Sequence, residues 1–251
     1  MKPYKYIQEF KIKYCDCDFK DELKPSTTLA LMEEVACASA DELGFGYQYL
    51  KPKGIAFMVS NIVCEFYQPM KLGEIITFKT WPLVPSYATF GREYQACGKC
   101  DEIYMNASSR WCAIDVQTGK LLSSKFLDNQ DYSTYNTARA LPVSHWKIPA
   151  FSIAESELKF TLCIANSEYD HNMHVNNTKY VDYCFNCFSV SELSTRSLRR
   201  FIISYLKQCK EGEIISFYRK KADEEHYYVQ GVNEKEEIVV QCEITFEREE
   251  V

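Results

Sequence analysis

Apolar and polar residues alternate along several short stretches of the chain, the pattern of β-strands with one buried face. Near the N-terminus, Phe10, Ile12 and Tyr14 alternate with lysines. Strand-like runs follow at 55–67, 74–81, 87–96 and 103–115, and again at 201–208, 213–220, 226–233 and 237–247. A further alternating run, Leu158 to Ile164, opens the second group. The pattern predicts a protein built largely of β-sheet.

Two stretches have helical spacing instead. In the first, Pro25 suits the first position of a helix and Gly44 suits the position after its end. The apolar residues between them recur three and four positions apart: Leu29, Met32, Val35, Ala36 and Leu43. In the second, Asn176 or Asn177 can cap a helix. Its apolar side would carry Tyr180, Cys184, Cys187, Phe188 and Ser191. Both helices therefore have one face to bury.

The order of elements repeats along the chain. Gly73-Glu74-Ile75-Ile76-Thr77-Phe78 recurs as Gly212-Glu213-Ile214-Ile215-Ser216-Phe217, and each copy lies within the order strand, polar turn, helix, run of strands. One amphipathic helix on an antiparallel sheet buries a face of each, which is the plan of a hotdog fold. We predict an α+β protein with two tandem hotdog domains, residues 1–120 and 155–251. Residues 121–154, polar and interrupted by Pro142 and Pro149, would connect them.

Composition and charge limit the classes of partner. The chain has 251 residues, and its 46% of hydrophobic residues is enough for a packed core. A formal net charge of -6 disfavours nucleic acid and anionic membranes as partners. No stretch approaches the ~20 apolar residues of a membrane span. Because the N-terminal residues show no export or transit pattern, we expect a cytoplasmic protein.

The chain is rich in cysteine, with twelve residues of this type. In a reducing cytoplasm these should be free thiols. Three pairs have spacings that metal ligands also use: Cys15 and Cys17, Cys97 and Cys100, and Cys184 and Cys187. Buried thiols that act as small hydrophobic side chains are a better interpretation than a structural zinc, so we expect no metal.

The densest cluster of chemically capable residues lies between the strand at 158–164 and the second helix. Asp170, Asn172 and His174 stand at alternate positions, with His171 between them. In an extended or turn segment, alternate side chains point the same way, so the first three could meet in one cavity. A neutral imidazole can take a proton from water, a carboxylate can orient it, and an amide can donate to a carbonyl oxygen that gains charge. Together these roles suffice to hydrolyse an activated acyl group.

A polar turn followed by a helix cap would explain the asparagines without any catalysis. It does not explain two histidines beside them. The matching junction of the first half has Asp16, Asp18, Asp21 and Glu22 but no His or Asn, so the second half is predicted to be the catalytic copy. The chain has no Gly-x-Ser-x-Gly motif, which argues against an α/β-hydrolase.

The run Asp170-His171-Asn172-Met173-His174-Val175-Asn176-Asn177-Thr178-Lys179-Tyr180 resembles the active-site segment of plant and bacterial acyl-acyl carrier protein thioesterases. The first half matches this family in Thr80-Trp81-Pro82, Arg92-Glu93-Tyr94, Ser108-Ser109-Arg110-Trp111 and Ile114-Asp115. The resemblance extends from about Tyr6 to Phe246. It implies tandem hotdog domains, catalytic Asp170, Asn172 and His174, no cofactor, and acyl carrier protein (ACP) as the partner that carries the substrate.

The chain departs from the family pattern at one position. The family shows Tyr-x-x-Glu-Cys on a strand of the second domain, and the matching residues here are Tyr205-Leu206-Lys207-Gln208-Cys209. Glutamine can hydrogen-bond a water but cannot act as a base. The general base is therefore His174 or Asp170, with Gln208 as a further site residue. Cys209 as the nucleophile of a Cys-His-Asn arrangement is the weaker alternative.

Two further sets of residues are candidates for substrate contacts. The acyl chain would lie beneath the first helix, lined by Met32, Val35, Phe57, Met58 and Val59, although core packing is at least as good an interpretation of each. An acidic carrier protein needs a basic patch, and Arg196, Arg199 and Arg200, in a loop after the second helix, are the best candidates. The sequence is compatible with a monomer or a homodimer.

Three alternative functions stay open. An acyl-coenzyme A thioesterase would need contacts for nucleotide phosphates, and no phosphate loop is present. A hotdog dehydratase would need a carboxylate on the second helix, for which Asp182 is the candidate. A non-catalytic module that binds acyl groups or a carrier protein would not need the polar cluster.

Overall fold

The computed structural model describes residues 3–127 and 130–248. It divides into two compact units, with the boundary between Ser144 and His145. This boundary falls inside the segment predicted to connect two domains. Within the described residues, no helix combines the length and the apolar character that crossing a bilayer requires.

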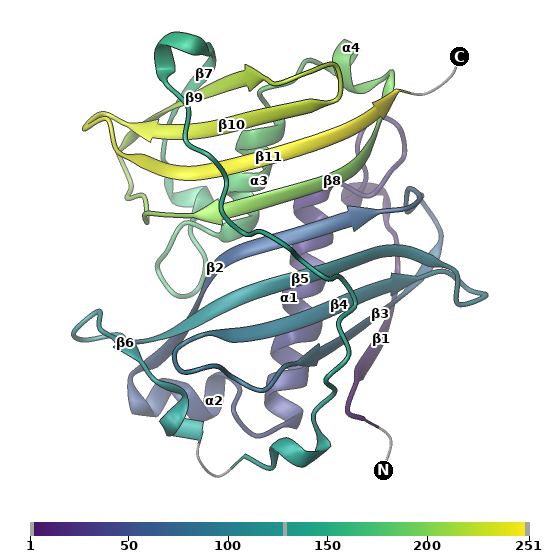
Figure 1. Cartoon of the computed structure of the whole chain (residues 1–251), viewed down its shortest axis with the longest axis vertical. Coiled ribbons are helices and arrows are strands. Elements are labelled where there is room, and N and C mark those ends of the chain that lie inside the picture. The colour runs from purple at the N-terminus through teal and green to yellow at the C-terminus, as the bar shows by residue number, and fades with distance from the viewer. Residues whose placement is uncertain (1–2, 128–129, 249–251) are drawn as a thin grey trace. The chain divides into compact units, whose positions relative to one another are not determined.

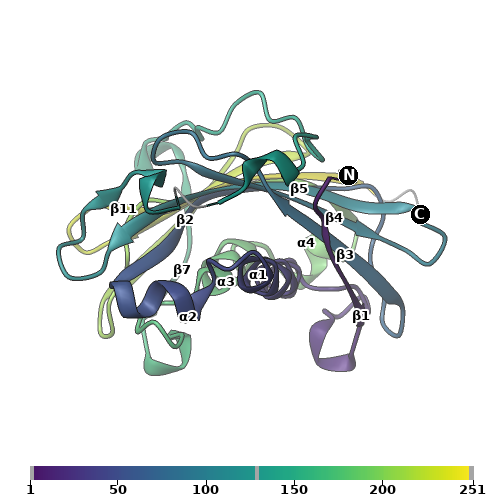
Figure 2. The same cartoon turned by 90° about the horizontal axis from the view of Figure 1, so that it is seen from below.

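The first unit is an antiparallel sheet with one long helix. Its strands are β1 (Tyr6–Lys11), β2 (Ile55–Phe66), β3 (Ile75–Pro82), β4 (Phe90–Cys97), β5 (Ile103–Asp115) and the short β6 (Leu121–Leu122). They pair in the order β1-β3-β4-β5-β2, with β6 added to β5. The helices are α1 (Pro25–Glu42) and α2 (Tyr47–Leu50). Figure 2 shows α1 lying against one face of the β3–β5 sheet.

Helix α1 forms where its sequence pattern predicts. Pro25 is its first residue, and Gly44 follows its end with a positive φ of 79°, which glycine adopts without strain. Leu29, Met32 and Val35 are buried beneath it, as the spacing predicts. Burying side chains of this size contributes about 1.5–3 kcal/mol each, so the apolar face fixes α1 on the sheet.

The second unit repeats the plan with a shorter helix (Figure 1). Its strands are β7 (Glu157–Cys163), β8 (Arg196–Tyr205), β9 (Ile214–Lys221), β10 (His226–Asn233) and β11 (Ile238–Arg248). They pair in the antiparallel order β8-β11-β10-β9-β7. The helices are α3 (Asn177–Phe185) and α4 (Val190–Leu193). Helix and antiparallel sheet in both units confirm the predicted hotdog architecture.

Two boundaries in the second unit differ from the prediction. The predicted helix through Ser191 instead ends at Phe185, and a new short helix starts after Ser189, whose hydroxyl accepts a hydrogen bond from the Glu192 N–H at 3.2 Å. A serine at this position competes for backbone donors and favours a new start. Strand β8 begins at Arg196 rather than 201, because its arginines pair with residues at the end of β11.

The polar turn ahead of each long helix is the same structure in both units. In the first, Asp18 Oδ1 accepts the N–H groups of Lys20 at 2.8 Å and Glu22 at 3.2 Å. Asp21, between them, has a positive φ of 58°. A bridge between Cys17 and Leu23 closes the turn. The internal repeat seen in the sequence is therefore a repeat of detailed backbone geometry.

The family-like motifs of the first half form a buried polar network. Glu93 is fully buried and accepts hydrogen bonds from Ser108 Oγ at 2.7 Å and Arg139 Nη1 at 3.0 Å. It also accepts the N–H groups of Ala140 at 2.9 Å and Leu141 at 3.2 Å. A buried carboxylate needs this many donors. The network fixes residues 139–141 on the first unit, which explains why the boundary between the units lies beyond them.

Candidate functional site

The Asp170–His174 segment is a tight turn anchored by the carboxylate of Asp170. Asp170 Oδ1 accepts the N–H groups of Asn172 at 2.8 Å and His174 at 3.2 Å. The Asp170 N–H donates to the His174 carbonyl at 2.8 Å, and Met173 has a positive φ of 60°. The Asp18 turn of the first unit has the same hydrogen bonds and a positive φ at the equivalent position. The turn therefore holds Asn172 and His174 at positions that the first unit fills with Lys20 and Glu22.

Helix α3 starts directly after this turn. Asn176 is its N-cap, and its side chain accepts the N–H of Thr178 at 2.9 Å and the hydroxyl of Thr178 at 2.7 Å. The Asn176 carbonyl accepts the Lys179 N–H at 3.0 Å. The predicted capping role of Asn176 is confirmed. Among the described residues, the N–H of Asn177 finds no acceptor and remains available to a ligand.

The side chains of the turn are not arranged as local alternation suggested. The segment is bent rather than extended, and the Asp170 carboxylate is directed at its own backbone. Asn172 is exposed and His174 is half-buried. In the described part of the chain, no hydrogen bond joins the side chains of Asp170, Asn172 and His174. The turn thus brings the three residues together through the backbone, with the amide and the imidazole left accessible.

The loop between β8 and β9 lies beside the start of α3 and carries Gln208 and Cys209. The Cys209 N–H donates to the Tyr180 hydroxyl at 3.1 Å, and the Glu211 N–H donates to the Tyr169 hydroxyl at 2.7 Å. Two tyrosines from the segment 169–180 therefore hold this loop. Gln208, which the family pattern picked out in the sequence, therefore lies in a loop that neighbours the start of α3.

Cys209 is poorly suited to act as a nucleophile. Its side chain is 1% exposed, and burial raises the pKa of its thiol. A reactive cysteine instead has a lowered pKa and access to solvent. The surroundings of Cys209 favour a thiol that fills space.

The residues proposed to line an acyl pocket do not share one face. Met32 and Val35 are buried on α1, and Met32 Sδ lies 4.0 Å from Cys64 Sγ of β2. Phe57 packs near the end of α1, with its ring 6.5 Å from that of Phe45. Successive residues of a strand point to opposite faces, so Met58 points away from the face that holds Phe57 and Val59. The alternation along β2 therefore separates Met58 from the other four.

The three arginines proposed for carrier docking, hereafter the β8 arginines, lie on a strand and not in the predicted loop. Arg199 pairs with Glu247, and Arg200 Nη1 lies 3.6 Å from Glu243 Oε1. Arg196 Nη1 donates to the Tyr227 hydroxyl at 2.7 Å. Partial pairing with acids reduces the net positive charge that these residues present.

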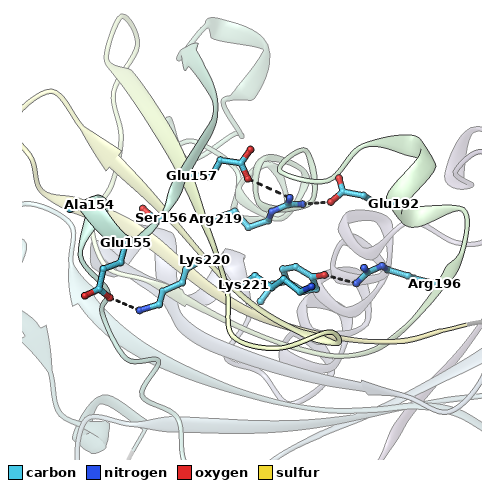
Figure 3. Close-up of a pocket in the computed structure, with 10 residues that line it drawn as sticks. Ala154, Glu155, Ser156, Glu157, Glu192, Arg196, Arg219, Lys220 and Lys221 are labelled. Atoms are coloured by element: carbon cyan, nitrogen blue, oxygen red, sulfur yellow. Dashed lines mark hydrogen bonds and ion pairs between the residues drawn. The ribbon is translucent and has the colours of Figure 1, made fainter.

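Arg196 also lines an open, charged pocket of about 490 Å³ in the second unit. The residues that line the pocket are Ala154, Glu155, Ser156, Glu157, Glu192, Arg196, Arg219, Lys220, Lys221 and Tyr227. Figure 3 shows Arg219 between Glu157 and Glu192, and Lys220 paired with Glu155. None of the lining residues belongs to the Asp170 turn or to the loop of Gln208. The chemistry of the side chains, and not pocket volume, therefore identifies the site.

The cysteine pairs do not form a metal centre in the described part of the chain. Cys97 is buried while Cys100 is exposed, and Cys184 and Cys187 are buried on and just after α3. No group of three His, Cys, Asp or Glu residues in 3–127 and 130–248 is arranged to hold a metal ion.

Sequence reasoning did not predict the contacts that tyrosines make around α3. The Tyr205 hydroxyl donates to the Asn177 carbonyl at 3.2 Å, and the rings of Tyr180 and Tyr205 lie 5.9 Å apart. Tyr183 is buried and contacts the ring of Tyr180 at 6.0 Å. The spacing of Tyr180 and Tyr183 on one helix face carried a signal for packing, but nothing in the local sequence places Tyr205 beside Asn177.

These features define a tandem hotdog protein whose second unit carries an Asp-anchored turn with an accessible amide and imidazole. The acyl-ACP thioesterase N-terminal domain matches residues 3–125, and the acyl-ACP thioesterase C-terminal domain matches residues 154–248. The chain belongs to the acyl-ACP thioesterase family. It is a thioester hydrolase that acts on acyl-ACP.

Solved structures share the fold over nearly the whole chain. An acyl-ACP thioesterase from Bacteroides thetaiotaomicron has 21% identity and a TM-score of 0.88, covering 97% of this chain and 98% of that one. The 12:0-ACP thioesterase from Umbellularia californica has 14% identity and a TM-score of 0.88, covering 98% of each chain. A putative oleoyl thioesterase from Lactobacillus plantarum has 14% identity and a TM-score of 0.86, covering 99% of this chain and 98% of that one. No curated protein sequence matches the chain.

Proposed function

We propose that the Asp170–His174 turn is the reaction centre at which acyl-ACP is hydrolysed to a free fatty acid and the ACP thiol. The comparison of the two turns carries this proposal. Both units build the same Asp-anchored backbone, but only the second places an amide and an imidazole on it. A purely structural turn would not need that change of residue type.

The steps of the reaction use His174 and water. The imidazole of His174 takes a proton from a water molecule, whose oxygen attacks the thioester carbonyl carbon. The carbonyl oxygen gains negative charge, which the side-chain amide of Asn172 and the N–H of Asn177 can stabilise. The carbon–sulfur bond then breaks, and the ACP thiolate takes the proton from His174. All protons and electron pairs are accounted for without a cofactor.

Asp170 acts in this scheme by holding the turn. Its Oδ1 is engaged by two backbone N–H groups, so the carboxylate fixes where Asn172 and His174 lie. Misplacing a catalytic group by about 1 Å can cost about 100-fold in rate. Gln208 contributes hydrogen bonds from the neighbouring loop, and Cys209 takes no part in bond formation.

The acyl chain would lie in the first unit beneath α1, with Met32, Val35, Phe57 and Val59 as candidate contacts. The β8 arginines would contribute to docking the acidic carrier protein, in a monomer or a homodimer. A cytoplasmic location fits the twelve cysteines, all of which are free.

The experiment that tests the proposal compares two neighbouring histidines. Purified chain is given a panel of acyl-ACPs, and the released fatty acids are identified and quantified. His174→Ala should lower kcat at least ~100-fold through loss of the general base. His171→Ala, which changes the residue between Asp170 and Asn172 but lies outside the proton path, should lower it far less. Normal turnover by the His174 variant, or equal loss in both, would refute the assignment, and hydrolysis of acyl-coenzyme A alone would refute the substrate.

A further inference from the structure

Three buried polar atoms on α3 and the loop beside it have no hydrogen-bond partner among the described residues. They are Asn177 Oδ1, Tyr183 Oη and Gln208 Nε2. Buried polar groups in folded proteins are nearly always paired, so an unpaired group calls for a specific explanation such as a role in binding or catalysis. Asn177 offers a hydrogen-bond acceptor and Gln208 offers a donor, so the two are complementary.

Contacts on both sides of Gln208 hold it against the first turn of α3. Three residues before it, the Tyr205 hydroxyl donates to the Asn177 carbonyl at 3.2 Å. One residue after it, the Cys209 N–H donates to the hydroxyl of Tyr180, which lies one helical turn beyond Asn177, at 3.1 Å. Asn177 itself follows the Asp170 turn directly. The two amides therefore belong to the same corner of the unit as His174.

The attacking water has hydrogen-bonding needs that these groups complete. A water molecule has two protons and two lone pairs in a tetrahedral arrangement. One proton goes to His174 and one lone pair attacks the carbonyl carbon. The second proton then needs an acceptor, and the second lone pair needs a donor.

We propose that Asn177 Oδ1 and Gln208 Nε2 bind the attacking water, with Asn177 accepting its second proton and Gln208 donating to its second lone pair. This rests on the proposed function of the Asp170–His174 turn. It also gives a reason for glutamine where the family pattern has glutamate. A glutamine cannot take the proton, so the base is His174 and position 208 keeps only the task of holding the water.

The test uses variants that remove one amide each, with a control from the same unit. Asn177→Leu and Gln208→Met keep the side-chain size and delete the polar group. The control is Gln241→Met, because Gln241 Nε2 is also buried without a partner. Its neighbour Cys242 contacts Cys184 of α3, so Gln241 points to the opposite face of the sheet.

Each of the two site variants should lower kcat on acyl-ACP roughly tenfold, the effect of one lost hydrogen bond to the reacting water, with KM changed less than about twofold. The control should leave kcat and KM unchanged. Thermal unfolding should change little in either Gln→Met variant, since each removes a buried amide nitrogen that has no partner. Full kcat in both site variants would overturn the proposal, as would an equal loss in the control.

A pH profile supplies a readout that a structural role would not move. Gln208→Glu places a titrating carboxylate at the water, so its kcat should gain an ionisation that the native chain lacks. A profile identical to the native one would mean that position 208 does not touch the reacting water. If the native chain hydrolyses acyl-ACP, His174→Ala abolishes this and the amide variants keep full kcat, only the present inference fails. If the native chain releases no fatty acid, the proposed function itself fails.

Discussion

The pair Asp18 and Asp170 allows the structural and catalytic contributions of one carboxylate to be separated within a single chain. Each accepts two backbone N–H groups, at 2.8 and 3.2 Å in both units. A hydrogen bond of this kind contributes about 1 kcal/mol net, so Asp18→Ala and Asp170→Ala should each cost about 2 kcal/mol of folding stability. If the chain unfolds in one transition, that corresponds to a fall in Tm of roughly 4–8 °C for each variant.

The catalytic effects should differ although the structural effects match. Asp170 fixes the backbone of Asn172 and His174, so its loss should lower kcat on acyl-ACP about 100-fold. Asp18 fixes Lys20 and Glu22, so its loss should change kcat less than about twofold. Urea unfolding followed by circular dichroism gives the stability of both variants, and fatty acid release well below the lower Tm gives kcat. An equal fall in kcat in the Asp18 and Asp170 variants would mean that lost stability alone explains the effect. Normal turnover in the Asp170 variant would show that catalysis does not need the anchored turn.

Three further outcomes follow from the geometry. Cys209→Ala should keep most of its activity, because burial raises the pKa of that thiol, and an acyl group trapped on Cys209 by mass spectrometry would contradict this. Changing the three β8 arginines to glutamine should raise KM for acyl-ACP and leave a small uncharged thioester unaffected, whereas equal loss on both substrates would indicate damage to the fold. Met173→Asn should raise folding stability by about 0.5–1 kcal/mol, measured by urea unfolding, because Met173 is 75% exposed and asparagine tolerates its positive φ; an unchanged midpoint would contradict the strain argument.

The hotdog architecture could be predicted because it depends on local pattern. Pro25 favours a helix start, Gly44 favours a helix end, and the alternating runs favour strands. The tertiary structure keeps each of these local preferences. The repeat around Gly73 and Gly212 added the information that two copies are present. Helix boundaries were less predictable where a polar side chain competes for backbone hydrogen bonds. Ser189 caps the start of α4, so the helix that the apolar spacing would have continued ends before it.

The segment proposed as the reaction centre could be picked out from the sequence, but its internal geometry could not. The run from Asp170 to Asn177 identified the segment and its helix cap. The prediction that alternate side chains converge allowed for an extended or a turn segment. The positive φ of Met173 makes a tight turn, in which the Asp170 carboxylate faces its own backbone and not the other two side chains. The contacts of Gln208 and Cys209 with α3 join residues about thirty positions apart, and only the packed structure can place them.

The repeat also decides which residues can serve as evidence for catalysis. The anchoring aspartate occurs in both units and accepts hydrogen bonds of the same length, so the turn alone explains an aspartate at this position. What distinguishes the units is the pair of residues whose N–H groups it holds. In the first unit these are Lys20 and Glu22, whose side chains form an ion pair at 3.1 Å and so satisfy each other. In the second they are Asn172 and His174, whose side chains the turn leaves accessible. The assignment of the reaction centre therefore depends on positions 172 and 174, and variants at those two positions test it more directly than variants of the aspartate.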